Sequence, residues 1–146
     1  MRELPRQLTI DQLEELFEGR TALVERLAEI EDPLDNAVDV ISTLTEDEKL
    51  AALDAHPAIG QREGLSARSA AEQGTDEDRA VEAELADLNR RYEERFGFRF
   101  VVFVNRRPKA EIVPILHTRL ARSRDEELDS ALSELVAIAR DRWQRG

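Results

Sequence analysis

The fold class of this chain depends on how one stretch is interpreted, Phe96-Gly97-Phe98-Arg99-Phe100-Val101-Val102-Phe103-Val104. It contains four of the five phenylalanines of the protein, and its composition favours extended backbone. The sequence offers no obvious second strand with which this run could pair, so a β-sheet is not expected. We therefore predict a buried extended segment at about residues 98–104, around which helices pack.

On both sides of this segment, apolar residues recur at the three- and four-residue spacing of amphipathic helices. The capping box Thr45-Glu46-Asp47-Glu48 opens a helix that should stop just before His56-Pro57, because the residue before a proline avoids helical backbone. Residues 60–74 are expected to be irregular or weakly helical. The prediction is an all-α fold, a single-domain bundle of about seven to eight helices over residues 1–146. The other predicted helices cover residues 9–18, 21–30, 33–44, 76–96, 109–122 and 123–143.

Charge and composition limit the classes of partner. The 146 residues carry a formal net charge of −11, which would repel nucleic acid and anionic membrane surfaces. With 41% hydrophobic residues the chain can form one core, but no apolar run approaches the roughly 20 residues of a membrane span. The absence of cysteine excludes disulfides, a thiolate nucleophile and cysteine-ligated metals. We expect a cytoplasmic protein with no nucleic-acid or membrane partner.

The first candidate catalytic residue is His56, one of only two histidines. Histidine is the side chain best suited to moving protons near neutral pH, and this one lies at a break that proline and glycine mark. A polar cluster of Ser69, Glu72 and Gln73 follows it. The residues alone leave other roles open, because a histidine before a proline is often structural, and Ser69 and Glu72 could form a capping box. The second histidine, His117, is expected on a helix surface.

Four motifs follow one another in a fixed order, and they are His56-Pro57, Ser69-x-x-Glu72-Gln73, Phe96-Gly97-Phe98-x-Phe100 and Ile138-x-x-x-Arg142. In this order and spacing they resemble the family of 2-oxo-4-hydroxy-4-carboxy-5-ureidoimidazoline (OHCU) decarboxylases. Members of that family act last on the route from urate to (S)-allantoin. The resemblance covers more than half of the chain, and the N-terminal helices are compatible with it.

The resemblance implies a carbon–carbon lyase that needs no cofactor or metal, acts on a small ureidoimidazoline and forms a homodimer. His56 would be the catalytic acid or base, Glu72 would orient its imidazole, and Arg142 would hold the substrate carboxylate with its guanidinium fork. The substrate would also contact Pro57, Ser69, Gln73 and the backbone amides of Phe100, Val101, Val102, Phe103 and Val104.

Three positions weaken parts of this interpretation. Ala58 stands where the family often has Asp or Arg, and Arg99 stands where it often has Pro. Neither position is expected to carry the chemistry, so both should affect the shape of the pocket more than the reaction. Arg142 lies at an arginine-rich helix end, where interaction with the helix dipole is a sufficient reason for a cation.

Two other functions remain open from the residues. The alternative is an all-helical binding or interaction module that keeps the fold and has lost catalysis, although such a module would have no need of the set His56, Glu72, Gln73 and Arg142. A metal hydrolase that uses His56, Glu72 and His117 is the third interpretation. It ranks last because the sequence lacks a metal-ligand spacing such as His-x-x-x-His.

Overall fold

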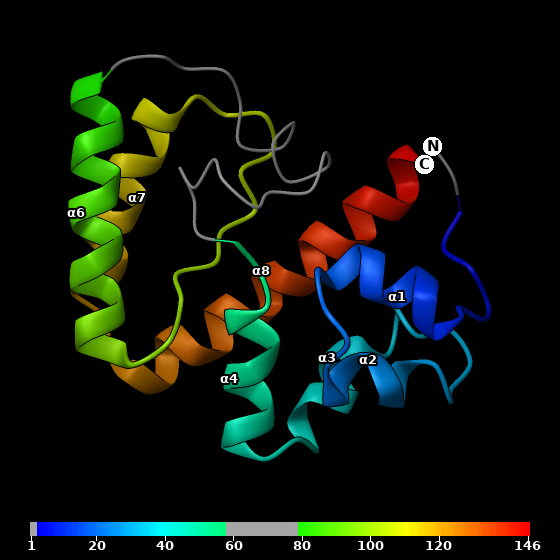
Figure 1. Ribbon diagram of the computed structural model, residues 1–146. Helices are drawn as coiled ribbons and strands as arrows, with labels where there is room; N and C mark the ends of the chain where they lie inside the picture. Colours follow the sequence, from blue (N-terminus) through cyan, green and yellow to red (C-terminus); the bar gives the residue numbers. More distant parts are fainter. Residues whose placement is uncertain (1–2, 58–78) are drawn as a thin grey trace.

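Figure 1 shows the computed structural model, which describes residues 3–57 and 79–146. Within these two ranges the chain forms seven helices and no strand, so the predicted all-α fold is confirmed there. Residues 60–74, predicted to be irregular or weakly helical, lie outside the described residues. The helices are α1 (Ile10–Phe17), α2 (Ala22–Leu27), α3 (Ala37–Ser42), α4 (Glu46–Asp54), α6 (Arg79–Phe96), α7 (Lys109–Leu120) and α8 (Arg124–Arg145).

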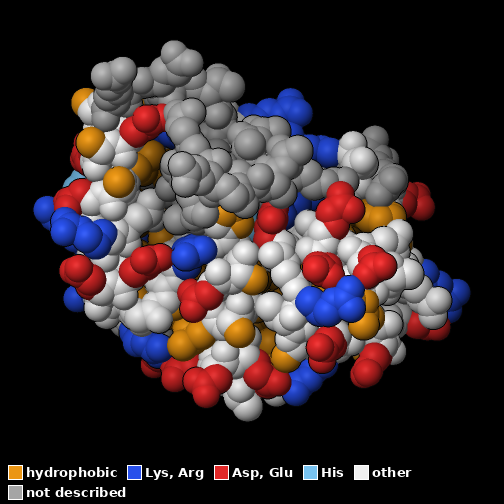
Figure 2. All heavy atoms as spheres, in the orientation of Figure 1, with side chains coloured by type: hydrophobic (Ala, Val, Ile, Leu, Met, Phe, Trp, Pro, Cys, Tyr) orange, Lys and Arg blue, Asp and Glu red, His pale blue; other side chains and the backbone are white. Residues whose placement is uncertain are grey.

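The C-terminal helix α8 connects the parts of the fold. It packs against α1, α3 and α4, while α6 and α7 lie side by side as a second group (Figure 1). The two ends of the chain meet, because the Trp143 indole N–H donates a 2.7 Å hydrogen bond to the carbonyl of Glu3. Acidic and basic side chains are interspersed over the face that Figure 2 shows. Among the described residues, no helix is both long and apolar enough to cross a membrane.

Three helices within the described ranges begin at a capping box, in which two side chains three residues apart bond each other's backbone N–H groups. At α4, Thr45 accepts from the Glu48 N–H at 3.2 Å and Glu48 accepts from the Thr45 N–H at 2.9 Å, as predicted. The helices α1 and α8 begin in the same way at Thr9 and Ser123. At its other end α4 stops at Asp54, short of the His-Pro pair, which is also as predicted.

The helix predicted over residues 33–44 is shorter in the structure, where α3 covers only Ala37–Ser42. The chain turns at Asp32, whose φ is +49°. The side-chain amide of Asn36 donates hydrogen bonds to the carbonyls of Glu31 and Asp32 at 3.3 and 3.1 Å. The carbonyl of Asp32 also accepts the backbone N–H groups of Asp35 and Asn36, both at 3.1 Å, so this stretch forms a turn and α3 begins only after Asn36.

The run between α6 and α7 is extended and buried, which confirms the prediction for residues 98–104. The side chains of Phe98, Phe100 and Val101 are all only 1–2% exposed. The ring of Tyr92 on α6 packs edge-on against Phe98 and Phe100, with ring centroids 5.9 and 5.1 Å apart. This aromatic packing attaches the extended segment to α6.

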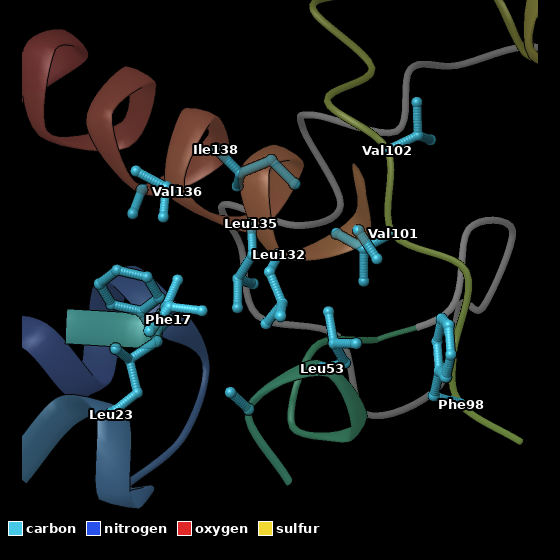
Figure 3. Packing of buried hydrophobic residues seen from close by; sticks show 14 of the residues in the cluster. Phe17, Leu23, Leu53, Phe98, Val101, Val102, Leu132, Leu135, Val136 and Ile138 are labelled. Carbon is cyan, nitrogen blue, oxygen red and sulfur yellow. The ribbon is translucent and has the colours of Figure 1, made fainter. Parts of the chain in front are cut away.

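Helices cover the other side of the segment. Figure 3 shows Val101 from the segment, Leu53 from α4, and Leu132 and Leu135 from α8 pointing into the space between these elements. All four side chains are at most 3% exposed. Burying a leucine of this kind contributes roughly 1.5–3 kcal/mol, so this contact fixes the end of α4 relative to the extended segment.

Arginine side chains take the place of a neighbouring strand along the segment. A buried carbonyl needs a hydrogen-bond donor, which a sheet would otherwise supply. Arg119 Nη1 donates to the carbonyl of Val101 at 3.0 Å. Arg107 donates to the carbonyls of Phe103 and Val104 at 2.6 and 2.9 Å. These contacts explain how a β-prone run stays single in this part of the fold.

Candidate active site

His56 lies directly after α4, where Pro57 prevents the helix from continuing. Its backbone N–H donates to the carbonyl of Leu53 at 3.1 Å, and the residue is partly buried. Within the described part of the chain, the buried Nδ1 of its imidazole has no hydrogen-bond partner. Burial first, and then the positive charge of Arg142, lowers the pKa of His56 from its usual 6.5 to about 4. The imidazole is therefore neutral at pH 7 and can accept a proton.

Arg99 holds the backbone of His56 in place. Its Nη1 donates hydrogen bonds to the carbonyls of His56 and Asp54 at 2.7 and 3.2 Å, and its Nε lies 3.3 Å from the Glu93 carboxylate. The last carbonyls of a helix have no partner within the helix, so this guanidinium completes the C-terminal end of α4. Arg99 thus contributes more than the pocket shape that the sequence suggested for this position.

Arg142 approaches the same place from α8. Its side chain is only 2% exposed, and its Nη1 donates to the carbonyl of Leu16 at 2.9 Å. The same nitrogen lies 3.1 Å from the carboxylate of Glu18. The positive charge of Arg142 acts on the imidazole of His56 and lowers its pKa. The structure thus brings together the residue predicted to transfer protons and the residue predicted to bind a carboxylate.

Glu18 and Gly19 also belong to this site, and the sequence did not reveal them. Glu18 caps α1 with φ of 65°, in the left-handed region where residues other than glycine are uncommon. Its side chain is 13% exposed, and its negative charge opposes Arg142 by raising the pKa of His56. Gly19 lies so close to α4 that an added Cβ would be 2.9 Å from the Cβ of Ala55. No spacing rule links the ends of α1 and α4, so only their packing reveals this contact.

Gly19→Ala is expected to lower the free energy of unfolding by about 1–3 kcal/mol, because the new methyl group overlaps with Ala55. Urea unfolding followed by far-ultraviolet circular dichroism measures the change. The double variant Gly19→Ala/Ala55→Gly removes the overlap. Its loss in free energy of unfolding should therefore be smaller than the losses of the two single variants added together. Strictly additive effects would show that this contact is not the cause.

Among the described residues, both cations and an anion act on His56. Of the charged residues that shift its pKa, Arg142 and Arg99 are cations and Glu18 is an anion. In the part of the chain that the structure describes, no three His, Cys, Asp or Glu side chains come together as a metal site. His117, which the metal-hydrolase interpretation would use, instead contacts a glutamate of α6 at 3.2 Å and is 55% exposed, as expected of a surface residue.

The structure describes a part of the predicted site. His56, Pro57 and Arg142 are described, and so is the segment Phe100–Val104. This segment is connected to the backbone of His56 by Arg99, the residue directly before Phe100. The other predicted site residues lie outside the described residues, and they are Ser69, Glu72 and Gln73.

The sequence of this chain matches the family model of OHCU decarboxylases over residues 2–144. The uric acid degradation bifunctional protein PucL of Bacillus subtilis is 29% identical over 154 residues, which cover 97% of this chain and 31% of that protein. The 2-oxo-4-hydroxy-4-carboxy-5-ureidoimidazoline decarboxylase of Haloferax volcanii is 32% identical over 103 residues, which cover 68% of this chain and 61% of that protein. The chain therefore spans less than two thirds of the length of these relatives.

Two solved structures share the fold. The crystal structure of an OHCU decarboxylase in the presence of (S)-allantoin matches with a TM-score of 0.73 and 23% identity, over 90% of this chain and 94% of that chain. The crystal structure of an (S)-allantoin synthase matches with a TM-score of 0.68 and 22% identity, over 91% of this chain and 47% of that chain. The family match over nearly the whole sequence confirms the resemblance seen in the motifs, and this chain belongs to the OHCU decarboxylase family.

Proposed function

We propose that this chain decarboxylates OHCU to (S)-allantoin in urate degradation, without a metal or a cofactor. The observation that carries the proposal is the placement of the buried Arg142 within electrostatic reach of His56, in a member of the OHCU decarboxylase family. An arginine can bind a carboxylate through two parallel hydrogen bonds, and a neutral imidazole can move a proton. Both functions are needed to decarboxylate this substrate.

Substrate binding would prepare His56 for proton transfer. The guanidinium of Arg142 carries five N–H donors on three nitrogens, so it can contact Glu18 and a substrate carboxylate at the same time. The bound carboxylate would offset the positive charge that helps to lower the pKa of His56. A substrate that binds as an anion therefore makes the imidazole a better proton acceptor.

The reaction then needs position and a proton more than a cofactor. The carboxylate is attached to a carbon next to a C=N bond, so the electron pair left by departing carbon dioxide flows into that bond. Neutral His56 would accept the proton of the 4-hydroxyl group and return it to one face of the neighbouring carbon, which gives a single enantiomer. One further proton comes from solvent for each carbon dioxide released.

The remaining predicted contacts complete this proposal. Glu72 would hold the second nitrogen of the His56 imidazole in one tautomer. The ring and the ureido group would be held by backbone amides of Phe100–Val104, a segment that arginine side chains bind through its carbonyl groups. Pro57, Ser69 and Gln73 would form other walls of the pocket.

We further propose that residues 1–146 form one OHCU decarboxylase-like domain, which works as a homodimer in the cytoplasm. The family match over residues 2–144 supports the single domain. Sedimentation equilibrium of the purified protein tests the homodimer, because a mass close to that of one chain at micromolar concentration would contradict it.

The test of the activity is optical. OHCU is generated in place from urate with a uricase and a hydroxyisourate hydrolase, and circular dichroism follows the product after this protein is added. Rapid growth of the (S)-allantoin signal is the expected result. Slow formation of racemic product, at the rate of the protein-free control, would contradict the decarboxylase and favour a catalytically inactive binding module.

A further inference from the structure

Glu18, at the end of α1, has a backbone conformation that is unfavourable for a residue other than glycine. Its φ of 65° lies in the left-handed region, although Gly19, which adopts this conformation more readily, is the next residue. In this conformation the Glu18 carboxylate reaches the buried guanidinium of Arg142 at 3.1 Å. Gly19 in turn is packed against Ala55, the neighbour of His56. The end of α1 is thus attached both to Arg142 and to the chain beside the imidazole.

Glu18 is the negative member of the charges around His56. In the described part of the chain, α8 contributes Arg142, the extended segment contributes Arg99, and Glu93 of α6 contacts Arg99. Both arginines disfavour a proton on the imidazole, whereas Glu18 favours one. Arg99 is paired with Glu93, and Glu18 supplies the negative charge that lies against Arg142.

We propose that Glu18 is a positioning residue for the decarboxylation: its carboxylate holds the Arg142 guanidinium in place and offsets its charge, so that His56 can still accept a proton. The role in catalysis rests on the proposed function. It makes a distinctive prediction, because removing the charge of Glu18 takes away one anion that competes with the substrate carboxylate for Arg142, while it weakens the proton acceptor. Substrate binding and proton transfer should therefore respond in opposite directions.

Glu18→Gln tests this with an almost unchanged side-chain shape. We expect kcat to fall about tenfold, part of the usual contribution of a general base, with KM unchanged or lower. Glu14→Gln is the matched control, because this residue is also on α1 and pairs with the exposed Arg20 at 2.9 Å. Glu18→Asp keeps the charge and tolerates the left-handed backbone, so its kcat should lie closer to that of the unaltered protein. A rise in KM with unchanged kcat would overturn the proposal.

A second measurement does not depend on turnover. The chain has two histidines, so nuclear magnetic resonance can follow each imidazole through a pH titration, with His117→Asn to assign the signals. The pKa of His56 should be lower in Glu18→Gln than in the unaltered protein, and also lower in Arg99→Gln/Glu18→Gln than in Arg99→Gln.

The two measurements separate two failures. An unaltered protein that forms no (S)-allantoin would overturn the proposed function, while the titration would still decide whether Glu18 acts on His56. An active protein in which Glu18→Gln leaves both kcat and the His56 pKa unchanged would overturn only the role of Glu18. Urea unfolding of each variant checks that the variant is folded under the conditions of the kinetic and titration measurements.

Discussion

His56→Asn is expected to lower the turnover number by about 10²–10⁴-fold, the usual contribution of a positioned acid or base, while the protein stays folded. Asparagine keeps a polar side chain at the end of α4 but cannot accept and return a proton at neutral pH. The buried Nδ1 of His56 has no hydrogen-bond partner among the described residues, so the substitution breaks no hydrogen bond of this atom in that part of the chain. The rate of (S)-allantoin formation, followed by circular dichroism, measures the effect.

The matched control is His117→Asn, which makes the same change at the only other histidine. Its side chain is 55% exposed and contacts a half-exposed glutamate, so we expect turnover close to that of the unaltered protein. If His56→Asn kept more than about a tenth of the activity, a loss far smaller than proton-transfer residues cause, the acid–base role would be wrong.

The same variant should show an altered dependence of stability on pH. The pKa of His56 is about 4 in the folded protein and near 6.5 when the chain is unfolded, so between these values the unfolded chain binds the proton more readily. As the pH falls from 8 to 5, this group alone should lower the free energy of unfolding by about 2 kcal/mol. His56→Asn removes this loss, so its stability relative to the unaltered protein should rise as the pH falls. Urea unfolding at both pH values measures the difference.

The fold was predictable from the sequence where local pattern and burial agree. The capping box at Thr45 and the break at His56 depend on neighbouring residues, and both are found. The extended segment was predictable because a run of phenylalanine and valine had no second strand to join. What the sequence did not reveal is that arginines would bind its carbonyls: Arg107 does so from the turn directly after the segment, and Arg119 does so through the packing of α7.

The candidate site was less predictable than the fold. His56 is marked by its chemistry and by the following proline. Arg142 was predicted to bind a carboxylate through the resemblance alone, because its helix end also suits a cation for electrostatic reasons. Glu18 could not be found, since an acidic residue at the end of a helix is ordinarily a solvated one. Its importance comes from the packing of α1 against α8, which places it next to a buried guanidinium.

The largest effect on stability is expected at Glu127, which is fully buried in α8. The Tyr92 hydroxyl donates to it at 2.6 Å and Arg119 Nε at 2.7 Å, while Arg122 Nη1 lies 2.9 Å from its other oxygen. Burial, together with the bond to Glu127, raises the pKa of Tyr92 above its usual range, so the hydroxyl remains a donor. This one carboxylate therefore joins α6, α7 and α8, and it orients the guanidinium that holds the carbonyl of Val101.

Glu127→Gln is expected to lower the free energy of unfolding by about 3–5 kcal/mol, because it leaves the charge of the 8%-exposed Arg119 without its partner inside the protein. The amide keeps the size of the side chain, so lost charge and not a cavity would be responsible. Asp129→Asn, an exposed change on the same helix, should cost no more than about 0.5 kcal/mol. Urea unfolding of both variants decides the matter, since equal costs would mean that the buried carboxylate does not hold these helices together. Turnover should fall in Glu127→Gln as well, because the segment from Phe100 to Val104 depends on Arg119 for its position.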